Sequence, residues 1–505
     1  MPLRKLRTRN APSIIGRRNT TSPSICIIGG GMAAIAAGVK LVEAGFHAFT
    51  IFEKSEGLGG TWWVNRYPGS ECDVPSHLYS YGFFPYDWSR SHADRAEIQE
   101  YLETVAKHFA IRSHFQFGTT VQRATWNEEG QHYDVELFEG EHRQFDIVVS
   151  AVGMLSKPVI PSWPGLADFT GPAFHTSRWD ETVDLHGKRV AVVGTGSTAV
   201  QVVAQIAPIV GELSVFQREP GWVLPKQNVL FSAEDRATLR RPSRRILHRT
   251  RLRVINERGL RRGAIFHAGS KLSRNGEVAA RQFIDQEFSD RDDVRKAVTP
   301  SYPYPGKRPV FHSTFYATLK RANVQLVPQA VTEVTTTGVV DAAGVHREID
   351  VLVLATGFQA ANYLADLEIV GRDGHRLHDV WAGEPQAFLG VTVPQFPNFF
   401  MLYGPNTNGG EIVFMLERGA EHLVRSIRQM RRRNAKVVEV RERFYTTYNT
   451  WLQSKLRTTS WTTSRNYFTS PSGRVVTQWP FGALFYGALM LGLGPLSNRF
   501  SRRTR

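Results

Sequence analysis

Two segments of the chain repeat one arrangement, in which an apolar strand runs into a glycine turn and then a helix. The first, residues 24–34, contains the pattern G-x-G-x-x-A, and a second strand after it ends at Glu53. In a dinucleotide-binding unit, Gly29 permits the tight turn, Gly31 lets a pyrophosphate approach, and Ala34 keeps helix and strand close. A carboxylate at the strand end accepts hydrogen bonds from ribose hydroxyls, so Glu53 favours a cofactor without a 2′-phosphate, such as FAD or NAD.

The second copy, residues 189–199, differs from the first in the charge at its strand end. Its second strand is followed by Arg218, at the position that Glu53 occupies in the first copy. A cation at that place suits a 2′-phosphate, so this unit is expected to bind NADP. The residues of its turn that we expect to hold the cofactor phosphates are Gly194, Thr195, Gly196, Ser197 and Thr198.

This repeat predicts an α/β fold with two Rossmann-like dinucleotide-binding domains, one for FAD and one for NADP. The segment from 228 to about 299 breaks the α/β rhythm and is rich in arginine, so we expect a helical insertion in the NADP domain. The expected division is a basic tail at 1–23, a split FAD domain at 24–152 and 353–474, an NADP domain at 153–352, and a C-terminal tail at 475–505.

Composition restricts the class of protein further. Only two cysteines occur, Cys26 and Cys72, and no C-x-x-C is present, which excludes a disulfide scaffold, a zinc ribbon and a dithiol pair. We therefore expect a cytoplasmic, reducing location and no metal site. The net charge of +16 comes largely from arginine clusters at both ends and within residues 240–262. No basic module with interleaved aromatic residues occurs, so we expect no dedicated nucleic-acid partner.

The C-terminal tail leaves three alternatives open. Residues 475–498 carry no charge and residues 481–493 are strongly apolar, yet this core is shorter than the roughly 20 residues that a spanning helix needs. The tail can pack on the protein, make a peripheral membrane contact through residues 479–496, or span a membrane.

Two longer motifs resemble those of a known family, the type I Baeyer–Villiger monooxygenases among the class B flavoprotein monooxygenases. Residues 169–180 match F-x-G-x-x-x-H-x-x-x-W-[PD], through Phe169, Gly171, His175 and Trp179. Residues 59–73 fit the family pattern [AG]-G-x-W-x4-[FY]-P-[GM]-x3-D, and the resemblance extends over about residues 24–470.

The resemblance implies an NADPH- and O2-dependent enzyme that inserts oxygen next to a ketone carbonyl and gives an ester or lactone through a C4a-peroxyflavin. A related activity, oxygenation of sulfur or nitrogen by the same flavin, is the alternative. The ketone and O2 are then the small-molecule partners, and FAD and NADP are the cofactors.

The resemblance also implies roles for individual residues. Arg308 corresponds to the family's catalytic arginine, Asp73 to its partner carboxylate, and Lys307 to a ligand of the NADP 2′-phosphate. Trp461 matches a tryptophan on a mobile loop that folds over the nicotinamide cofactor, and the residues of the 169–180 motif couple the domains. The expected FAD-binding residues are Gly29, Gly31, Ala34, Glu53, Gly60, Thr61, Trp62, Asp73, Tyr79, Val121 and Met415.

Overall fold

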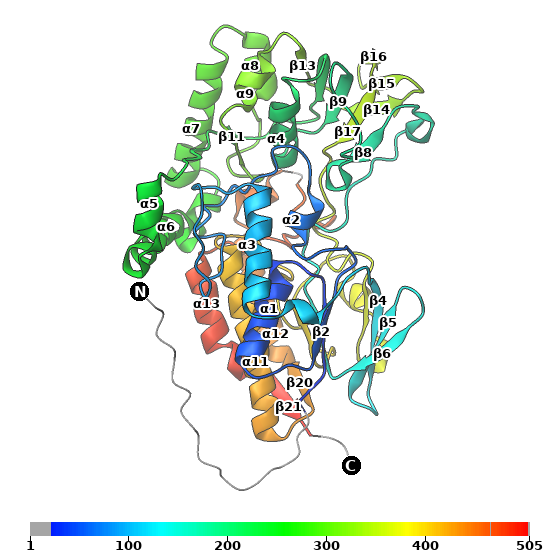
Figure 1. The fold of residues 1–505 in the computed structure, drawn as a ribbon, viewed down its shortest axis with the longest axis vertical. Coiled ribbons are helices and arrows are strands. Elements are labelled where there is room, and N and C mark those ends of the chain that lie inside the picture. The colour runs from blue at the N-terminus through cyan, green and yellow to red at the C-terminus, as the bar shows by residue number, and fades with distance from the viewer. Residues whose placement is uncertain (1–21, 465, 503–505) are drawn as a thin grey trace.

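Two five-stranded parallel sheets form the framework of the protein. The structure, a computed structural model, describes residues 22–464 and 466–502, so nearly all of the predicted basic tail at 1–23 lies outside the described residues. The two sheets occupy different halves of the molecule along its longest axis (Figure 1). The predicted α/β class with two Rossmann-like domains is confirmed.

The first sheet has the strand order β19-β7-β1-β2-β3, and all of its neighbouring strands are parallel. Its strands are β1 (Ile25–Ile28), β2 (Phe49–Phe52), β3 (Phe115–Gln116), β7 (Ile147–Ser150) and β19 (Phe399–Met401). Side chains of β1 alternate between two cores: Ile25 and Ile27 pack on one face of the sheet. Cys26 and Ile28 pack on the other. Burial on both faces explains why the strand reads as an unbroken apolar run.

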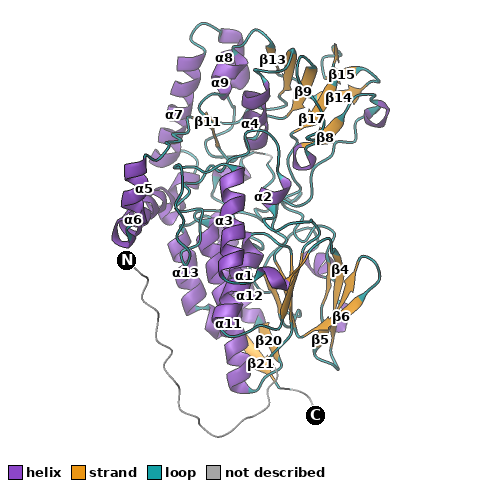
Figure 2. Ribbon diagram, in the orientation of Figure 1, coloured by secondary structure: helices purple, strands orange, loops and turns teal. Residues whose placement is uncertain are grey.

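Helices cover one face of the first sheet and a smaller sheet covers the other (Figure 2). The helices are α1 (Met32–Glu43), α3 (Arg95–His108), α11 (Ile412–Arg433) and α12 (Glu442–Leu456). The smaller sheet has the order β18-β4-β5-β6, with β4 (Val121–Asn127), β5 (His132–Leu137), β6 (His142–Phe145) and β18 (Glu368–Val370). The short helix α10 (Leu377–Trp381) packs into the core beneath it.

The second sheet repeats this plan. Its order is β13-β10-β9-β17-β8, all parallel, with β8 (Ala173–His175), β9 (Arg189–Val193), β10 (Glu212–Phe216), β13 (Val324–Val327) and β17 (Val351–Leu354). One face packs on α4 (Ser197–Ile206) and α9 (Phe315–Leu319). The other packs on an antiparallel sheet of β14 (Val331–Val334), β15 (Gly338–Asp341) and β16 (His346–Glu348).

The second sheet continues past the predicted domain boundary. Strand β17 pairs with β9 through Leu354, so Val353 and Leu354 belong to the second sheet. The sequence prediction places the return to the first domain at residue 353, whereas β17 stays in the second sheet through Leu354. The strand was expected to return the chain to the first domain, and only its pairing with β9 shows that it belongs to the second sheet.

Between β11 (Val223–Leu224) and β12 (Val310–Phe311) the chain forms four helices: α5 (Ala233–Arg240), α6 (Pro242–Leu260), α7 (Lys271–Glu287) and α8 (Asp292–Val298). Helix α7 packs into the core of the second domain through Ala280 and Ile284. Helix α6 instead contacts the first domain, where Arg249 donates to the Ser80 carbonyl at 2.7 Å and Arg253 pairs with Glu411 at 2.7 Å. Some arginines of this cluster thus join the two domains.

The C-terminal tail packs on the protein. Helix α13 (Ala483–Gly492) lies beside α11, α14 (Gly494–Ser497) follows, and β21 (Asn498–Ser501) pairs antiparallel with β20 (Val437–Val440). Trp479 is fully buried, and the Tyr486 hydroxyl donates to the Leu389 carbonyl at 2.9 Å. Within residues 22–464 and 466–502, no helix is both long and apolar enough to cross a membrane. Of the three alternatives for the tail, the structure supports packing on the protein and does not support the membrane contact through residues 479–496.

Candidate active site

A cavity of about 1890 Å³ lies where the two sheets face each other. It is lined by residues at the carboxyl ends of β1, β2 and β7 of the first sheet and of β9, β10 and β17 of the second. Ligands of open parallel sheets bind at these carboxyl ends of strands. The fold therefore brings both predicted dinucleotide turns to one site.

The first turn is built for a close approach to the backbone. Gly29 has φ +102°, and a Cβ there would lie 2.7 Å from the Ala151 carbonyl oxygen. Gly31 is the N-cap of α1 and lies against Gly60, whose own Cβ would meet the Gly31 Cα at 2.9 Å. Both positions line the cavity, so the free N–H groups at the start of α1 are open to a phosphate.

Glu53 directly follows β2 and lies next to this turn. Its carboxylate is buried and accepts hydrogen bonds from the backbone N–H groups of Gly30, at 2.5 Å, and of Ser55, at 2.8 Å. Glu53 lines the cavity, as the predicted ribose ligand must.

Trp62 and Tyr79 form an aromatic wall of the cavity. Trp62, on the short helix α2 (Thr61–Val64), donates from its indole nitrogen to the Tyr79 hydroxyl at 3.2 Å. Burial raises the pKa of Tyr79, so the hydroxyl stays protonated and neutral. Thr61 and Val121 also line the cavity.

The second turn copies the packing of the first. Gly194 has φ +122°, and its Cβ would meet the Ala355 carbonyl oxygen at 2.5 Å, just as Gly29 lies on that of Ala151. Each of these alanines directly follows the neighbouring strand of its sheet. Gly196 is the N-cap of α4, and the whole predicted turn, Gly194, Thr195, Gly196, Ser197 and Thr198, lines the cavity.

Lys307 and Arg218, the two residues predicted to bind the 2′-phosphate, both line the cavity but differ in their contacts. Lys307 is paired with Glu219, and its ammonium lies 5.0 Å from the Tyr302 ring centroid. Arg218 is exposed, lines the cavity, and makes no ion pair with any residue that the structure describes. Arg218 is thus the better placed of the two to meet a phosphate.

Arg308 and Asp73 form an ion pair across the cavity. One guanidinium nitrogen of Arg308, Nη2, donates to both carboxylate oxygens of Asp73, at 2.8 and 2.7 Å. Burial opposes the charge on Asp73, yet the nearby Arg308 guanidinium holds the pKa of this carboxyl below its ordinary value. The charge of Asp73 in turn raises the pKa of Arg308. The side chains remain 38% and 20% exposed, respectively, so the pair is open to a ligand in the cavity.

The 169–180 motif lies beside the cavity, which Ser177 and Arg178 line. Nδ1 of His175 accepts a hydrogen bond from the Ser177 N–H at 3.1 Å, so Nε2 carries the proton and donates to the Gly357 carbonyl at 3.1 Å. Burial lowers the pKa of His175 and keeps it neutral. Trp179 packs on Phe174, with ring centroids 5.1 Å apart, and Gly171 lies against the Phe169 ring. His175 thereby ties β8 to the turn after β17, at the junction of the two domains.

Three predicted cofactor residues do not line the cavity. Ala34 is fully buried within α1, and Met415 is buried on α11, whose neighbouring residues Ile412 and Leu416 do line it. Trp461 is buried against Phe266, with ring centroids 4.3 Å apart, and borders a second cavity of about 910 Å³.

Several cavity residues were missed by the sequence reasoning. Tyr403 and Tyr467 lie near Arg308, whose positive charge lowers the pKa that burial raises in both phenols. Gln201, on α4, accepts a hydrogen bond from the Tyr67 hydroxyl at 2.9 Å. Tyr67 stands within the 59–73 motif, which is the one signal that could have marked this contact.

Comparison with known proteins identifies the family. Residues 22–230 match the flavin-binding monooxygenase-like family. A Baeyer–Villiger monooxygenase of Pseudomonas aeruginosa is 36% identical over 463 residues, which is 90% of this chain and 87% of that protein. The chain belongs to the Baeyer–Villiger monooxygenase family. A Baeyer–Villiger monooxygenase of Streptomyces coelicolor is also 36% identical, over 90% of this chain and 88% of that protein.

Solved structures agree with this family. A cyclohexanone monooxygenase from Rhodococcus sp. Phi1, bound to NADP+, superposes with a TM-score of 0.87 and 29% identity, over 95% of this chain and 99% of that chain. An oxidised steroid monooxygenase bound to NADP gives a TM-score of 0.86 and 28% identity, over 96% and 100% of the two chains. As a member of the Baeyer–Villiger family, the protein is an FAD- and NADP-dependent monooxygenase.

Proposed function

We propose that the protein inserts one oxygen atom of O2 beside the carbonyl of a ketone, giving an ester or lactone, in the cavity where Arg308 faces Asp73. The single observation that carries this proposal is the ion pair in which one Arg308 nitrogen contacts both oxygens of Asp73, in a cavity lined by both dinucleotide turns. Among the described residues, Asp73 is the one carboxylate that pairs with Arg308. The guanidinium remains partly exposed, so it can also meet a ligand in the cavity.

The residues around the first turn fit FAD. The open backbone at Gly29 and Gly31 would receive the pyrophosphate, and Glu53 would exchange its backbone partners for ribose hydroxyls. Trp62 and Tyr79 would shield the ring system from water. When bound and reduced by NADPH, the flavin supplies the electrons that activate O2.

The residues around the second turn fit NADP. The N-terminus of α4 would hold the pyrophosphate, and Arg218 the 2′-phosphate. Lys307 would join it only by leaving Glu219, so we assign Arg218 the larger share of selectivity for NADPH over NADH.

Arg308 would act on the charge that develops during oxygen insertion. The carbonyl oxygen of the ketone becomes negative as a nucleophile adds to it, and a preorganised donor at that place lowers the barrier. Arginine keeps its charge at any working pH, and Asp73 holds the guanidinium in one orientation. Asp73 itself stays ionised at neutral pH because its pKa is lowered by Arg308.

Oxygen uptake with NADPH and a panel of ketones, with mass analysis of the products, tests the proposal. We expect products one oxygen heavier than the ketone, identified as esters or lactones. A protein that oxygenates sulfides or amines but none of the ketones would instead be a heteroatom monooxygenase.

A further inference from the structure

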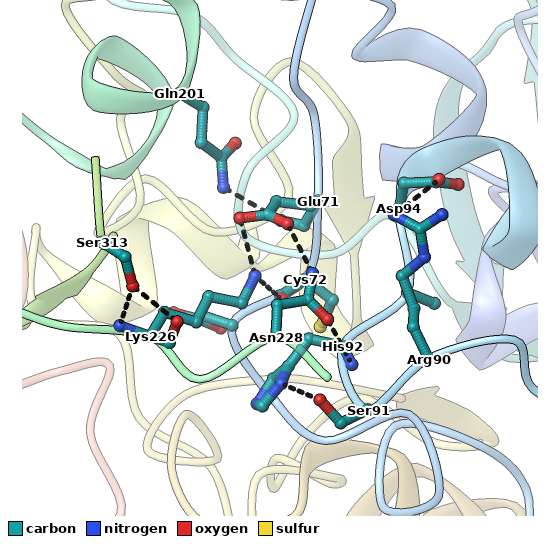
Figure 3. Close-up of polar contacts among 12 residues, drawn as sticks. Glu71, Cys72, Arg90, Ser91, His92, Asp94, Gln201, Lys226, Asn228 and Ser313 are labelled. Atoms are coloured by element: carbon teal, nitrogen blue, oxygen red, sulfur yellow. Dashed lines mark hydrogen bonds and ion pairs between the residues drawn. The ribbon is translucent and has the colours of Figure 1, made fainter. Parts of the chain in front are cut away.

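A buried lysine outside the predicted site joins the two domains. The side chain of Lys226, which follows β11 in the second domain, is only 4% exposed. Its ammonium pairs with Glu71 at 2.8 Å and donates to the Cys72 carbonyl at 2.7 Å (Figure 3). Both partners belong to the first domain and directly precede Asp73 in the chain. The lysine therefore holds the backbone from which Asp73 projects.

The second domain forms two further hydrogen bonds with Glu71 (Figure 3). Gln201, on α4, donates to the Glu71 carbonyl at 3.1 Å. Asn228 donates to the Glu71 carboxylate at 3.2 Å. On the side of the first domain, the Cys72 N–H donates to the Ala93 carbonyl at 3.0 Å. Residues 71 and 72 are thus fixed from both domains at once.

Lys226 is also coupled to the segment that carries Arg308. Strand β11 pairs with β12, and the Lys226 N–H donates to the Ser313 hydroxyl at 2.9 Å. The same hydroxyl donates back to the Lys226 carbonyl at 2.6 Å. Arg308 lies just before β12 and Ser313 just after it. The backbone of Lys226 is therefore bonded to the segment that carries Arg308, while its ammonium is bonded to the segment that carries Asp73.

We propose that Lys226 is a positioning residue: by holding residues 71 and 72, it keeps the Asp73 carboxylate opposite Arg308. The placement of the second domain thereby determines the geometry of the oxygenation site. This inference rests on the proposed role of Arg308. Burying an ammonium group is unfavourable unless it is paired and hydrogen-bonded. Here the Glu71 carboxylate and the Cys72 carbonyl, both from the first domain, meet that requirement. The buried charge therefore fixes the position of residues 71 and 72 relative to Lys226.

The test removes both charges of the Lys226–Glu71 pair and uses the holoenzyme. The double variant Lys226→Met with Glu71→Gln keeps the side-chain volumes and leaves no unpaired buried charge, which favours folding. Lys320→Met is the matched control, because Lys320 also bonds a carboxylate and a carbonyl, both of Glu287, and lies outside the residues lining the cavity.

The readouts separate positioning from stability. We expect the double variant to retain flavin and to be reduced by NADPH at a rate close to that of the parent enzyme. Displacement of a catalytic group by about 1 Å costs up to about 100-fold in rate. Ester formed per NADPH consumed should therefore fall about 10- to 100-fold, with hydrogen peroxide in its place, and KM for NADPH should stay within a factor of about 3. The Lys320→Met control should leave every readout unchanged.

Each other outcome overturns the inference. If the double variant forms ester with the coupling of the parent, Lys226 does not position Asp73. If neither the double variant nor Lys226→Met alone folds with flavin, the pair is a folding requirement and the proposal is also wrong. Arg308→Ala in the same assay keeps the two proposals apart, since retained ester formation there refutes the role of Arg308 itself.

Discussion

Substitution of Arg308 by alanine is the most direct test of the proposed oxygenation site. The variant removes the guanidinium that contacts both oxygens of Asp73, but none of the residues assigned to the flavin pyrophosphate or ribose. The two side chains of the ion pair remain 38% and 20% exposed, and Lys226 stays near Asp73 as a second cation, so the carboxylate left by the substitution is not without a counter-charge. We therefore expect the variant to fold, to bind FAD and to be reduced by NADPH.

The effect on oxygen insertion should be much larger than the effect on stability. Removal of one preorganised donor to a developing negative charge costs about 2.7–4 kcal/mol, or about 100- to 1000-fold in rate. Loss of the guanidinium also raises the pKa of Asp73, because burial of this carboxyl is then opposed by Lys226 without Arg308. Arg308→Lys should not restore the rate, since a guanidinium can bond Asp73 through one nitrogen and offer another to the ketone oxygen, whereas an ammonium has a single nitrogen.

The assay follows NADPH, hydrogen peroxide and ester in one reaction. In the alanine variant NADPH consumption should continue while hydrogen peroxide replaces ester as the product. The flavin absorbance and the melting temperature serve as controls and should change little. Ester formation at a rate near that of the parent enzyme would refute the assignment of Arg308, together with the alignment of residues 304–309 that led to it.

Three further predictions concern the cofactors and the tail. Arg218→Ala should raise KM for NADPH by about 10- to 150-fold, the loss expected for a charged hydrogen bond, and leave KM for NADH nearly unchanged; equal effects on both nucleotides would contradict the assignment. Gly29→Ala should abolish flavin retention and lower the melting temperature, because the new Cβ would lie 2.7 Å from the Ala151 carbonyl oxygen at φ +102°; a yellow variant of normal stability would contradict this. Deletion of residues 481–505 should prevent folding, measured by circular dichroism, because it uncovers α11 and removes buried side chains such as Tyr486, each worth about 1.5–3 kcal/mol; a folded, flavin-bound truncation would show that the packed tail is dispensable.

The two nucleotide turns could be predicted from sequence because their signals are local. In each unit the glycines, the helix start and the charged strand end lie within about 30 residues, and the structure places both turns at the same cavity. The charge at the strand end distinguishes the two units, and Arg218 does lie exposed in the cavity. The ion pair between Lys307 and Glu219 was not predictable, because these two residues are distant in sequence and only the fold brings them together.

Other features depend on how distant segments pack. Trp461 and Met415 carry side chains whose direction is set by Phe266 and by the turn of α11, and nothing in the local sequence indicates that they point away from the main cavity. The extent of the second sheet depended on the pairing of β17 with β9. The tail was ambiguous for the same reason, since an apolar helix has the same sequence whether it packs on α11 or on a lipid surface.

The pair of Arg308 and Asp73 is the clearest case of chemistry that exists only in three dimensions. The two residues lie 235 positions apart and on different domains, so their contact reports the relative placement of those domains. Lys226 and Glu71, 155 positions apart, meet at the same junction. A loosened junction would therefore separate Asp73 from Arg308 before it disturbed either dinucleotide turn, because each turn lies wholly within one domain. This ordering explains why we expect faults at the junction to appear as lost coupling between NADPH and ester rather than as lost cofactor binding.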